Sequence, residues 1–287
     1  MSIGIALAGG GMQGVAHIGA IKALEELGIK PDYISGTSSG SIFASMYAMG
    51  YTFEEMFEIV KQNYETLVGV EKARIVKAIL TYIRQKEIKI DGLINGQKLE
   101  DLVTKLAEEK GIKNIADIKM PLAIPTVDTI SSKECISISK EYNLYNEYID
   151  YIYDIPIGKA VRASMSFPGI YTTCNFEKYN FIDGGTKDNL PVGVLKDMGA
   201  EKVIAISFDL SHYIPSDNIF NIVLRAVDIF SIKDVRAAQK LADISIEIRN
   251  DDTSLLQTDN LEECMQIGYE TIMKNKEKIK EAMGIKC

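Results

Sequence analysis

Residues 33–50 read YISGTSSGSIFASMYAMG, and no other stretch says as much about the fold. The run at 33–35 predicts a short strand, and apolar residues at 42, 43, 46 and 49 predict an amphipathic helix. Between them lies the GxSxG sequence Gly36-Thr37-Ser38-Ser39-Gly40. A serine held in a sharp turn between a strand and a helix is a nucleophile elbow. We therefore predict that Ser38, at the centre of the motif, is a nucleophile.

A glycine-rich turn precedes this motif. The apolar run Ile3–Ala8 predicts a buried strand, which is closed by Gly9-Gly10-Gly11-Met12-Gln13-Gly14 before a helix begins. Backbone N–H groups at a helix N-terminus suit a developing oxyanion. The turn also satisfies GxGxxG, which is typical of a dinucleotide-binding oxidoreductase. That alternative is weakened because Asp32 precedes the second strand instead of ending it.

The rest of the chain alternates strand and helix patterns, which is typical of an α/β fold with a mainly parallel sheet. Strands are predicted near 121–127, 134–139, 203–208 and 244–248, with a hairpin inside 174–183. Helices are predicted near 191–198, 219–230, 235–241 and 261–283. We expect a single domain over residues 1–287, with a core at about 3–210, a helical insertion without strands at about 53–110, and C-terminal helices at about 217–283.

Composition excludes several classes of function. The chain has 287 residues, of which 46% are hydrophobic and 25% charged, so it is long and apolar enough to bury a large core. Its net charge of −8 argues against nucleic acid as a partner. The four cysteines form no CxxC pair and there are two histidines, so no metal site or disulfide framework is expected. Without a signal-peptide pattern or a long apolar run, we expect a cytoplasmic protein.

A serine nucleophile needs a base, and the residues alone leave several candidates. His212 is the histidine that lies late in the chain, where the triad hydrolases of this elbow type carry theirs, whereas His17 follows the glycine turn. If neither histidine serves, a carboxylate must, and Asp128, Asp183 and Asp209 each follow a predicted strand. The sequence pattern does not decide among them.

The ordered set of motifs resembles the bacterial patatin-like phospholipases. The glycine turn continues into His17-Ile18-Gly19-Ala20, and GxSxG follows it. Further along, the matching residues are Ala163-Ser164-Met165-Ser166-Phe167-Pro168-Gly169, then Asp183-Gly184-Gly185 with Asn189 and Pro191. The resemblance covers roughly residues 3–210 and implies a three-layer α/β/α fold.

The resemblance also implies a Ser-Asp dyad that acts on lipid or phospholipid esters without a cofactor. It carries the nucleophile onto Ser38, the base onto Asp183, and the oxyanion donors onto the N–H groups of Gly10 and Gly11. Many members have Arg or Lys where this chain has Gln13. A non-catalytic lipid-binding module on the same fold is the other alternative, and the intact dyad argues against it. Head-group preference and oligomeric state are left open.

A basic stretch stands out in the predicted insertion. Between residues 72 and 89 there is one acidic residue, Glu87, and the basic residues are Lys72, Arg74, Lys77, Arg84, Lys86 and Lys89. We hypothesise that this helical insertion contacts a lipid surface and partly covers the active site. The alternative is a solvated helix face, because runs of charge often only face water.

Overall fold

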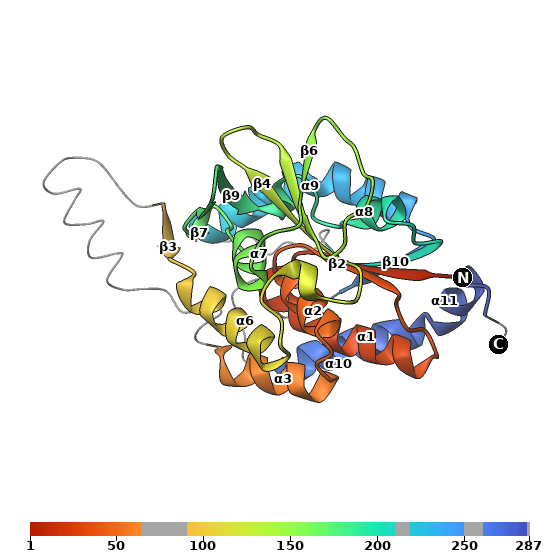
Figure 1. Ribbon diagram of the computed structural model, residues 1–287. Coiled ribbons are helices and arrows are strands. Elements are labelled where there is room, and N and C mark those ends of the chain that lie inside the picture. The colour runs from red at the N-terminus through yellow and green to blue at the C-terminus, as the bar shows by residue number, and fades with distance from the viewer. Residues whose placement is uncertain (65–90, 210–218, 250–260, 286–287) are drawn as a thin grey trace, which may run out of the picture.

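The computed structural model describes residues 1–64, 91–209, 219–249 and 261–285 (Figure 1). The strands are β1 (Ile3–Leu7), β2 (Tyr33–Gly36), β3 (Gly92–Ile94), β4 (Leu122–Asp128), β5 (Glu134–Ile138), β6 (Ile149–Ile152), β7 (Gly169–Tyr171), β8 (Cys174–Phe176), β9 (Tyr179–Asp183), β10 (Lys202–Phe208) and β11 (Ile244–Ile248). The α-helices are α1 (Ala16–Glu26), α2 (Ser39–Ala48), α3 (Phe53–Gln62), α6 (Gln97–Glu109), α7 (Ile157–Ser164), α8 (Val192–Asp197), α9 (Ile219–Leu241), α10 (Leu261–Lys274) and α11 (Lys276–Ala282). Three short 3₁₀ turns are η1 (Gly11–Val15), η2 (Ile115–Asp117) and η3 (Gly184–Thr186).

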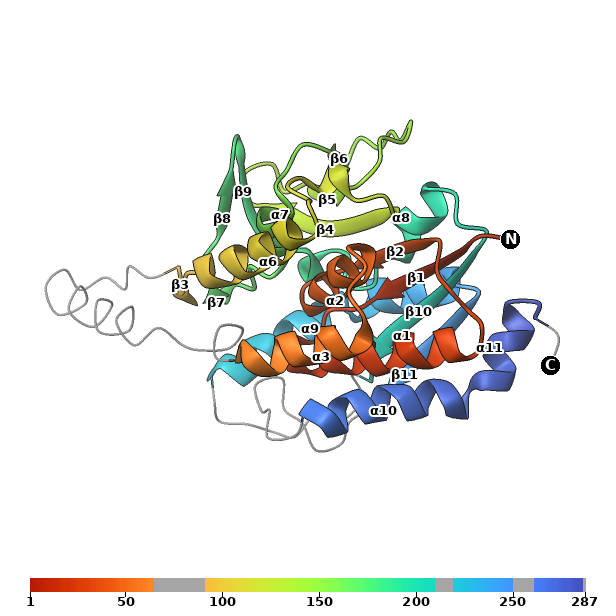
Figure 2. The same ribbon diagram turned by 60° about the horizontal axis from the view of Figure 1, so that its bottom comes forward.

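The main sheet is mostly parallel, as predicted. Its strand order is β11-β10-β1-β2-β4-β5-β6, and every neighbouring pair in this order is parallel except β4 and β5. The hairpin β8–β9 joins at β4, where β9 runs antiparallel. Helices α1, α3 and α10 cover one face of the sheet and α8 and α9 the other (Figures 1 and 2), which gives the three-layer arrangement.

The carboxyl ends of β1 and β2 form the edge of the sheet where the candidate site lies. Strand β1 pairs with β2 on one side and with β10 on the other. All of its residues are buried, as expected for a strand that is covered by helices on both faces of the sheet. Chain order reverses at β1, since β2 follows it in sequence and β10 comes much later. In open α/β sheets, ligands bind beside the carboxyl ends of the strands at such a point. The glycine turn after β1 and the elbow after β2 both lie there.

Three predictions about individual elements were wrong. The segment 53–110, predicted to be helical throughout, contains the short strand β3, which pairs in parallel with β7. The two helices predicted at 219–230 and 235–241 are the single helix α9. The helix predicted at 261–283 is divided at Asn275 into α10 and α11. The pattern also missed β6, β7 and α7.

Candidate active site

Ser38 lies in the turn that joins β2 to α2. Its φ of 52° and ψ of −126° place a non-glycine residue in a region that costs about 1–3 kcal/mol, which is the backbone of a nucleophile elbow. The two glycines of the motif are needed because backbone passes close to them. A Cβ atom on Gly36 would stand 2.3 Å from Gly40 O, and one on Gly40 would stand 2.5 Å from Leu7 O. Ser38 itself remains partly exposed, so its hydroxyl is accessible.

Asp183 ends β9 and is the carboxyl beside this serine. It is 1% exposed, its Oδ1 accepts from Gly185 N–H at 2.8 Å, and its Oδ2 has no hydrogen-bond partner among the described residues. Burial raises the pKa of Asp183 to about 7, although the neighbouring Ser38 hydroxyl and the Gly185 N–H favour the carboxylate. The Ser38 hydroxyl points instead to Met165 Sδ, at 3.8 Å. The hydrogen bond between the two residues is therefore not closed, which is common in ligand-free sites.

The end of α7 contacts both members of this pair. Ser38 N–H donates to Ser164 Oγ at 3.0 Å, and Ser164 Oγ donates to Pro125 O at 2.8 Å. Two residues further on, Ser166 O accepts from Asp183 N–H at 3.0 Å. The family resemblance includes residues 163–169 but implies no role for these serines. Their partners lie far away in the sequence, so no local pattern indicated these contacts.

The glycine turn lies against the elbow, and one of its N–H groups is engaged there. Gly10 N–H donates to the Ser39 hydroxyl at 3.1 Å, which differs from the expectation that this N–H faces the substrate. Gly11 is exposed at the start of η1. Gly9 is fixed from the other side, because its N–H donates to Asn189 O at 3.1 Å. The turn is thus held between the elbow and the loop that follows Asp183.

His17 is a part of the fold beneath this turn. It is fully buried, and its Nε2 lies 2.8 Å from Ala8 O, immediately before the glycines. Burial lowers the pKa of His17 to about 4, against the opposing hydrogen bond to Ala8, so the ring is neutral near pH 7. The ring also packs against Phe208, with centroids 4.9 Å apart. Within the described part of the chain, the contacts of His17 are with Ala8, Phe43 and Phe208 and not with Ser38. The other histidine, His212, lies outside the described residues.

These positions give a specific expectation for the histidines. His212→Asn should change fluorophosphonate labelling and esterase activity by less than about twofold, because a triad histidine would cost several orders of magnitude. His17→Asn should lower the melting temperature, since it loses the bond to Ala8, and keep a substantial fraction of the activity. The double variant should still be labelled at Ser38. Loss of labelling in His212→Asn at an unchanged melting temperature would restore a Ser-His mechanism.

The other two candidate aspartates are Asp128, whose carboxylate is engaged elsewhere, and Asp209. Asp128 accepts from Ser131 N–H at 2.8 Å and from Asn180 N–H at 2.9 Å. Burial acts to raise the pKa of Asp128, but these hydrogen bonds outweigh it and the pKa is lowered. Asp209 follows β10 and its N–H donates to Ile248 O at 3.0 Å, beside β11. Asp183 is the aspartate that the fold brings to Ser38.

Comparisons with known proteins agree on one family. The family model described as patatin-like phospholipase matches residues 5–196. Lysophospholipase NTE1 of Scheffersomyces stipitis is 28% identical over 205 residues, covering 71% of this chain and 12% of its own. Patatin-like phospholipase domain-containing protein 6 of Homo sapiens is 29% identical over 220 residues, covering 74% and 14%. The chain therefore spans only a small part of the length of these relatives.

Among solved structures, VipD from Legionella pneumophila has a TM-score of 0.47 and 14% identity, with 96% of this chain and 67% of that chain covered.

Proposed function

The chain belongs to the patatin-like phospholipase family, and from that premise we propose that it is a lipid acyl-ester hydrolase of the phospholipase A or lysophospholipase type. The observation that carries the proposal is the strained, accessible Ser38 beside the buried carboxyl of Asp183. A carboxyl whose pKa lies about 7 is a better proton acceptor than an ordinary aspartate, because a base works best near the operating pH. No histidine is required.

The proposed reaction has two steps. As Ser38 Oγ attacks the ester carbonyl, its proton passes to Asp183, and the tetrahedral intermediate collapses by expelling the alcohol, which takes that proton. Water then attacks the acyl-enzyme and passes a proton to Asp183. The bond to Ser38 Oγ breaks, Oγ takes that proton, and the carboxylic acid is released. The oxyanion would be stabilised by the Gly11 N–H and by the N–H of Ser39, the residue after the nucleophile. Such donors contribute roughly 3–4 kcal/mol each.

The two alternatives have less support. A dinucleotide site needs an acidic side chain at the carboxyl end of the second strand. Here Asp32 stands at the other end, where its Oδ2 accepts from Ile3 N–H at 2.8 Å. A non-catalytic binding module would have no use for the backbone strain at Ser38, because strain of that kind persists when the surrounding structure maintains it for a task.

A labelling experiment combined with a substrate panel tests the proposal. The protein is treated with a fluorophosphonate and assayed on phospholipid, lysophospholipid, triacylglycerol and short-chain nitrophenyl esters. We expect one covalent label on Ser38 and hydrolysis of at least one long-chain ester. Since the names of the curated relatives include lysophospholipase, lysophospholipid is the first substrate to try. Retention on a nucleotide resin without labelling would favour the oxidoreductase alternative.

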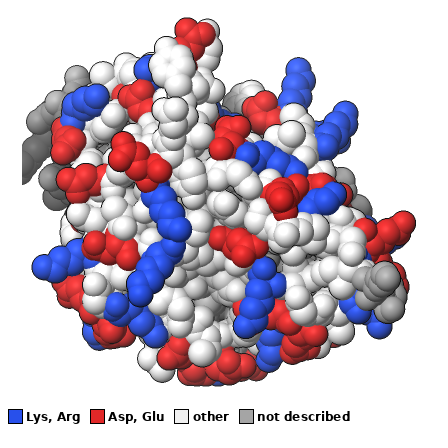
Figure 3. Space-filling view, turned by 45° about the vertical axis from the view of Figure 1, so that its right-hand side comes forward, with Lys and Arg blue, Asp and Glu red and all other residues white. Residues whose placement is uncertain are grey.

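We also propose that the protein meets its substrate at a lipid surface. Among the helices within the described ranges, none has the length and apolar character to cross a bilayer. On the face drawn in Figure 3, acidic and basic side chains are interspersed and no broad basic area is present. In the sequence, six basic residues and one acidic residue fall within 72–89, and these residues lie outside the described ranges.

Charge reversal tests this surface contact. We expect Lys77→Glu with Arg84→Glu to weaken binding to vesicles that contain anionic phospholipid by tenfold or more, because each basic residue near such a surface contributes about 1 kcal/mol. The matched control is Lys119→Glu with Lys140→Glu, two exposed residues flanking β4 and β5 at the end of the sheet away from Ser38. Equal binding by wild type and both double variants would reject the contact.

A further inference from the structure

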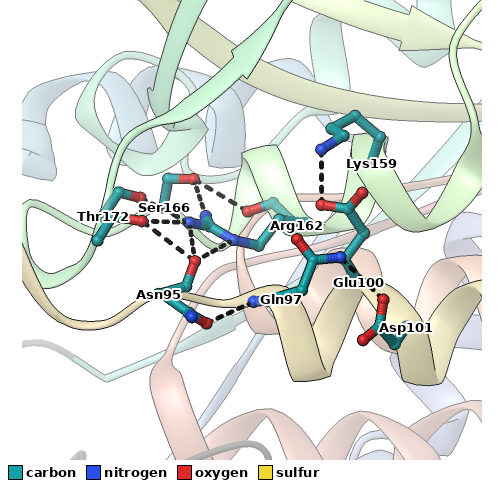
Figure 4. A network of polar contacts seen from close by, with 8 residues as sticks. All are labelled: Asn95, Gln97, Glu100, Asp101, Lys159, Arg162, Ser166 and Thr172. Carbon is teal, nitrogen blue, oxygen red and sulfur yellow. Dashed lines mark hydrogen bonds and ion pairs between the residues drawn. The ribbon is translucent and has the colours of Figure 1, made fainter. Parts of the chain in front are cut away.

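Arg162 is a buried cation inside the helix that contacts the proposed dyad. It is 3% exposed, and its guanidinium is surrounded by neutral oxygens (Figure 4). Nη1 donates to Ser166 Oγ at 2.5 Å, Nη2 donates to Thr172 O at 2.9 Å and to Thr172 Oγ1 at 2.8 Å, and Nε and Nη2 both donate to Asn95 O, at 3.1 and 2.6 Å. A buried charge costs several kcal/mol unless its donors are satisfied, so this hydrogen bonding is what allows the cation to be there.

The chain is shaped to admit this side chain. Gly96, next to Asn95 at the start of α6, has a φ of +75°, and a Cβ atom there would lie 1.8 Å from Arg162 Nε. Only glycine satisfies both the backbone angle and the space. The segment between β3 and α6 therefore packs directly against the guanidinium, which also donates a hydrogen bond to Ser166, in the segment after α7.

One arm of this network leads to the proposed base. Ser166 Oγ accepts from Arg162 Nη1 and donates to Arg162 O at 3.0 Å, so the Ser166 side chain is held by two hydrogen bonds to one residue. The Ser166 N–H also donates to Ala163 O at 3.0 Å, within the same segment. The carbonyl of the same Ser166 accepts from Asp183 N–H at 3.0 Å. Met165, which lies between Arg162 and Ser166 in the sequence, is the residue whose sulfur the Ser38 hydroxyl contacts. Arg162 thus fixes the short segment that lies between the two reacting side chains.

We propose that Arg162 is a positioning residue: through Ser166 it fixes the backbone of Asp183 so that the carboxyl faces the Ser38 hydroxyl. This inference rests on the proposed function only in giving Asp183 the role of base. The other arm of the network, to Thr172 and Asn95, fastens the neighbouring segments and does not lead to Asp183. Removing the hydrogen bond to Ser166 and removing the hydrogen bond to Thr172 should therefore have different effects on kcat.

Two matched variants separate the arms. Ser166→Ala and Thr172→Val each remove one side-chain acceptor of the same guanidinium, and both side chains are buried. In Ser166→Ala we expect kcat on the best ester of the panel to fall roughly 10- to 100-fold with KM little changed, since a misplacement of about 1 Å in a catalytic group has effects of that size. Fluorophosphonate labelling should slow by a similar factor. Thr172→Val should lower the melting temperature and leave kcat within about twofold.

A stability measurement follows Asp183 without reference to activity. Because burial raises the pKa of Asp183, ionising it costs stability as the pH rises, and Asp183→Asn should increase the melting temperature more at pH 8 than at pH 4. In the Ser166→Ala background the Asp183 carboxyl should shift toward water, so the extra increase in melting temperature that Asp183→Asn gives at pH 8 should become smaller. In the Thr172→Val background that extra increase should remain.

The outcomes are distinct. The positioning role would be overturned if Ser166→Ala and Thr172→Val had equal effects on kcat. It would also be overturned if Ser166→Ala left kcat unchanged and left the pH-dependent increase in melting temperature on Asp183→Asn undiminished. A wild type that neither hydrolyses esters nor labels would reject the proposed function instead, while the melting curves would still report whether Arg162 controls the environment of Asp183. Lys159→Met is a further control, because Lys159 joins α7 to Glu100 on α6 at 2.7 Å without reaching Ser166. It should leave kcat unchanged.

Discussion

Replacing Ser38 with alanine will abolish ester hydrolysis and fluorophosphonate labelling, with a loss of about 10⁴- to 10⁶-fold in kcat. The Ser38 hydroxyl oxygen would form the bond to the acyl group. The other hydroxyls of the elbow, on Thr37 and Ser39, are buried and already hydrogen-bonded. The fold should remain intact, because Ser38 precedes α2 without capping it through its side chain. The melting temperature should therefore change little, as measured by circular dichroism or calorimetry.

The matched control for this variant is Ser45→Ala. Ser45 is a buried serine on the same helix, and its hydroxyl donates to Ile42 O at 2.9 Å, within the helix and away from the turn. It should keep its activity and its label. If the purified Ser38→Ala protein retained more than a few per cent of wild-type turnover while Ser45→Ala behaved normally, another nucleophile would have to be sought.

Asp183→Asn should be nearly as damaging, with a loss of roughly 10⁴-fold in kcat. An amide has the same shape and can still accept from Gly185 N–H, but it cannot take the serine proton. In the wild type, kcat/KM should rise with pH through about 7 and then level off, because only the ionised Asp183 accepts a proton. The residual activity of Asp183→Asn should lack this rise.

The same substitution should stabilise the protein at alkaline pH. The pKa of Asp183 is about 7 in the folded state and near its ordinary value of 3.8 when unfolded. Between these values the folded state binds a proton that the unfolded state does not, so this group removes stability as the pH rises from about 4 to 7. Asparagine avoids that loss. A lower melting temperature for Asp183→Asn at pH 8 would contradict this account.

Asp128→Asn and Asp209→Asn are the controls for the assignment of the base. Asp128→Asn should lower the melting temperature, because its carboxylate accepts three hydrogen bonds from Ser131 and Asn180, and an amide nitrogen cannot. Neither variant should lose more activity than its loss of folded protein explains. Should either be inactive while Asp183→Asn remains active, the base has been assigned to the wrong residue.

The elements flanking the elbow could be predicted because their causes are local. The strand before Gly36 and the helix after Gly40 follow from apolar periodicity, and the two glycines mark the turn that the close backbone approach requires. The glycine turn after β1 is likewise visible in six consecutive positions, 9–14. The fold class and both proposed reacting residues therefore follow from short stretches of sequence, together with a family resemblance that singled out Asp183.

The features that escaped prediction depend on distant partners. Strand β3 is three residues long and exists because it pairs with β7. The Ser38 N–H finds its acceptor in Ser164, 126 positions away, and the Gly10 N–H finds Ser39, which no spacing rule connects to it. The sequence analysis assigned no role to Arg162 and missed the helix that contains it. Its burial could not be inferred because its partners include backbone carbonyls of distant segments.

The antiparallel entry of β9 beside β4 has a consequence for how the protein acquires its reactivity. The nucleophile, its turn and the glycine loop are all made within the first 40 residues, but the proposed base arrives on a hairpin that docks onto β4 from far along the chain. Local turns form quickly, whereas pairing between distant strands is slow because a large loop must close first. During refolding, a reactive serine should therefore appear only after β9 has docked. The time at which Ser38 becomes reactive toward a covalent probe during refolding would therefore report when β9 pairs with β4.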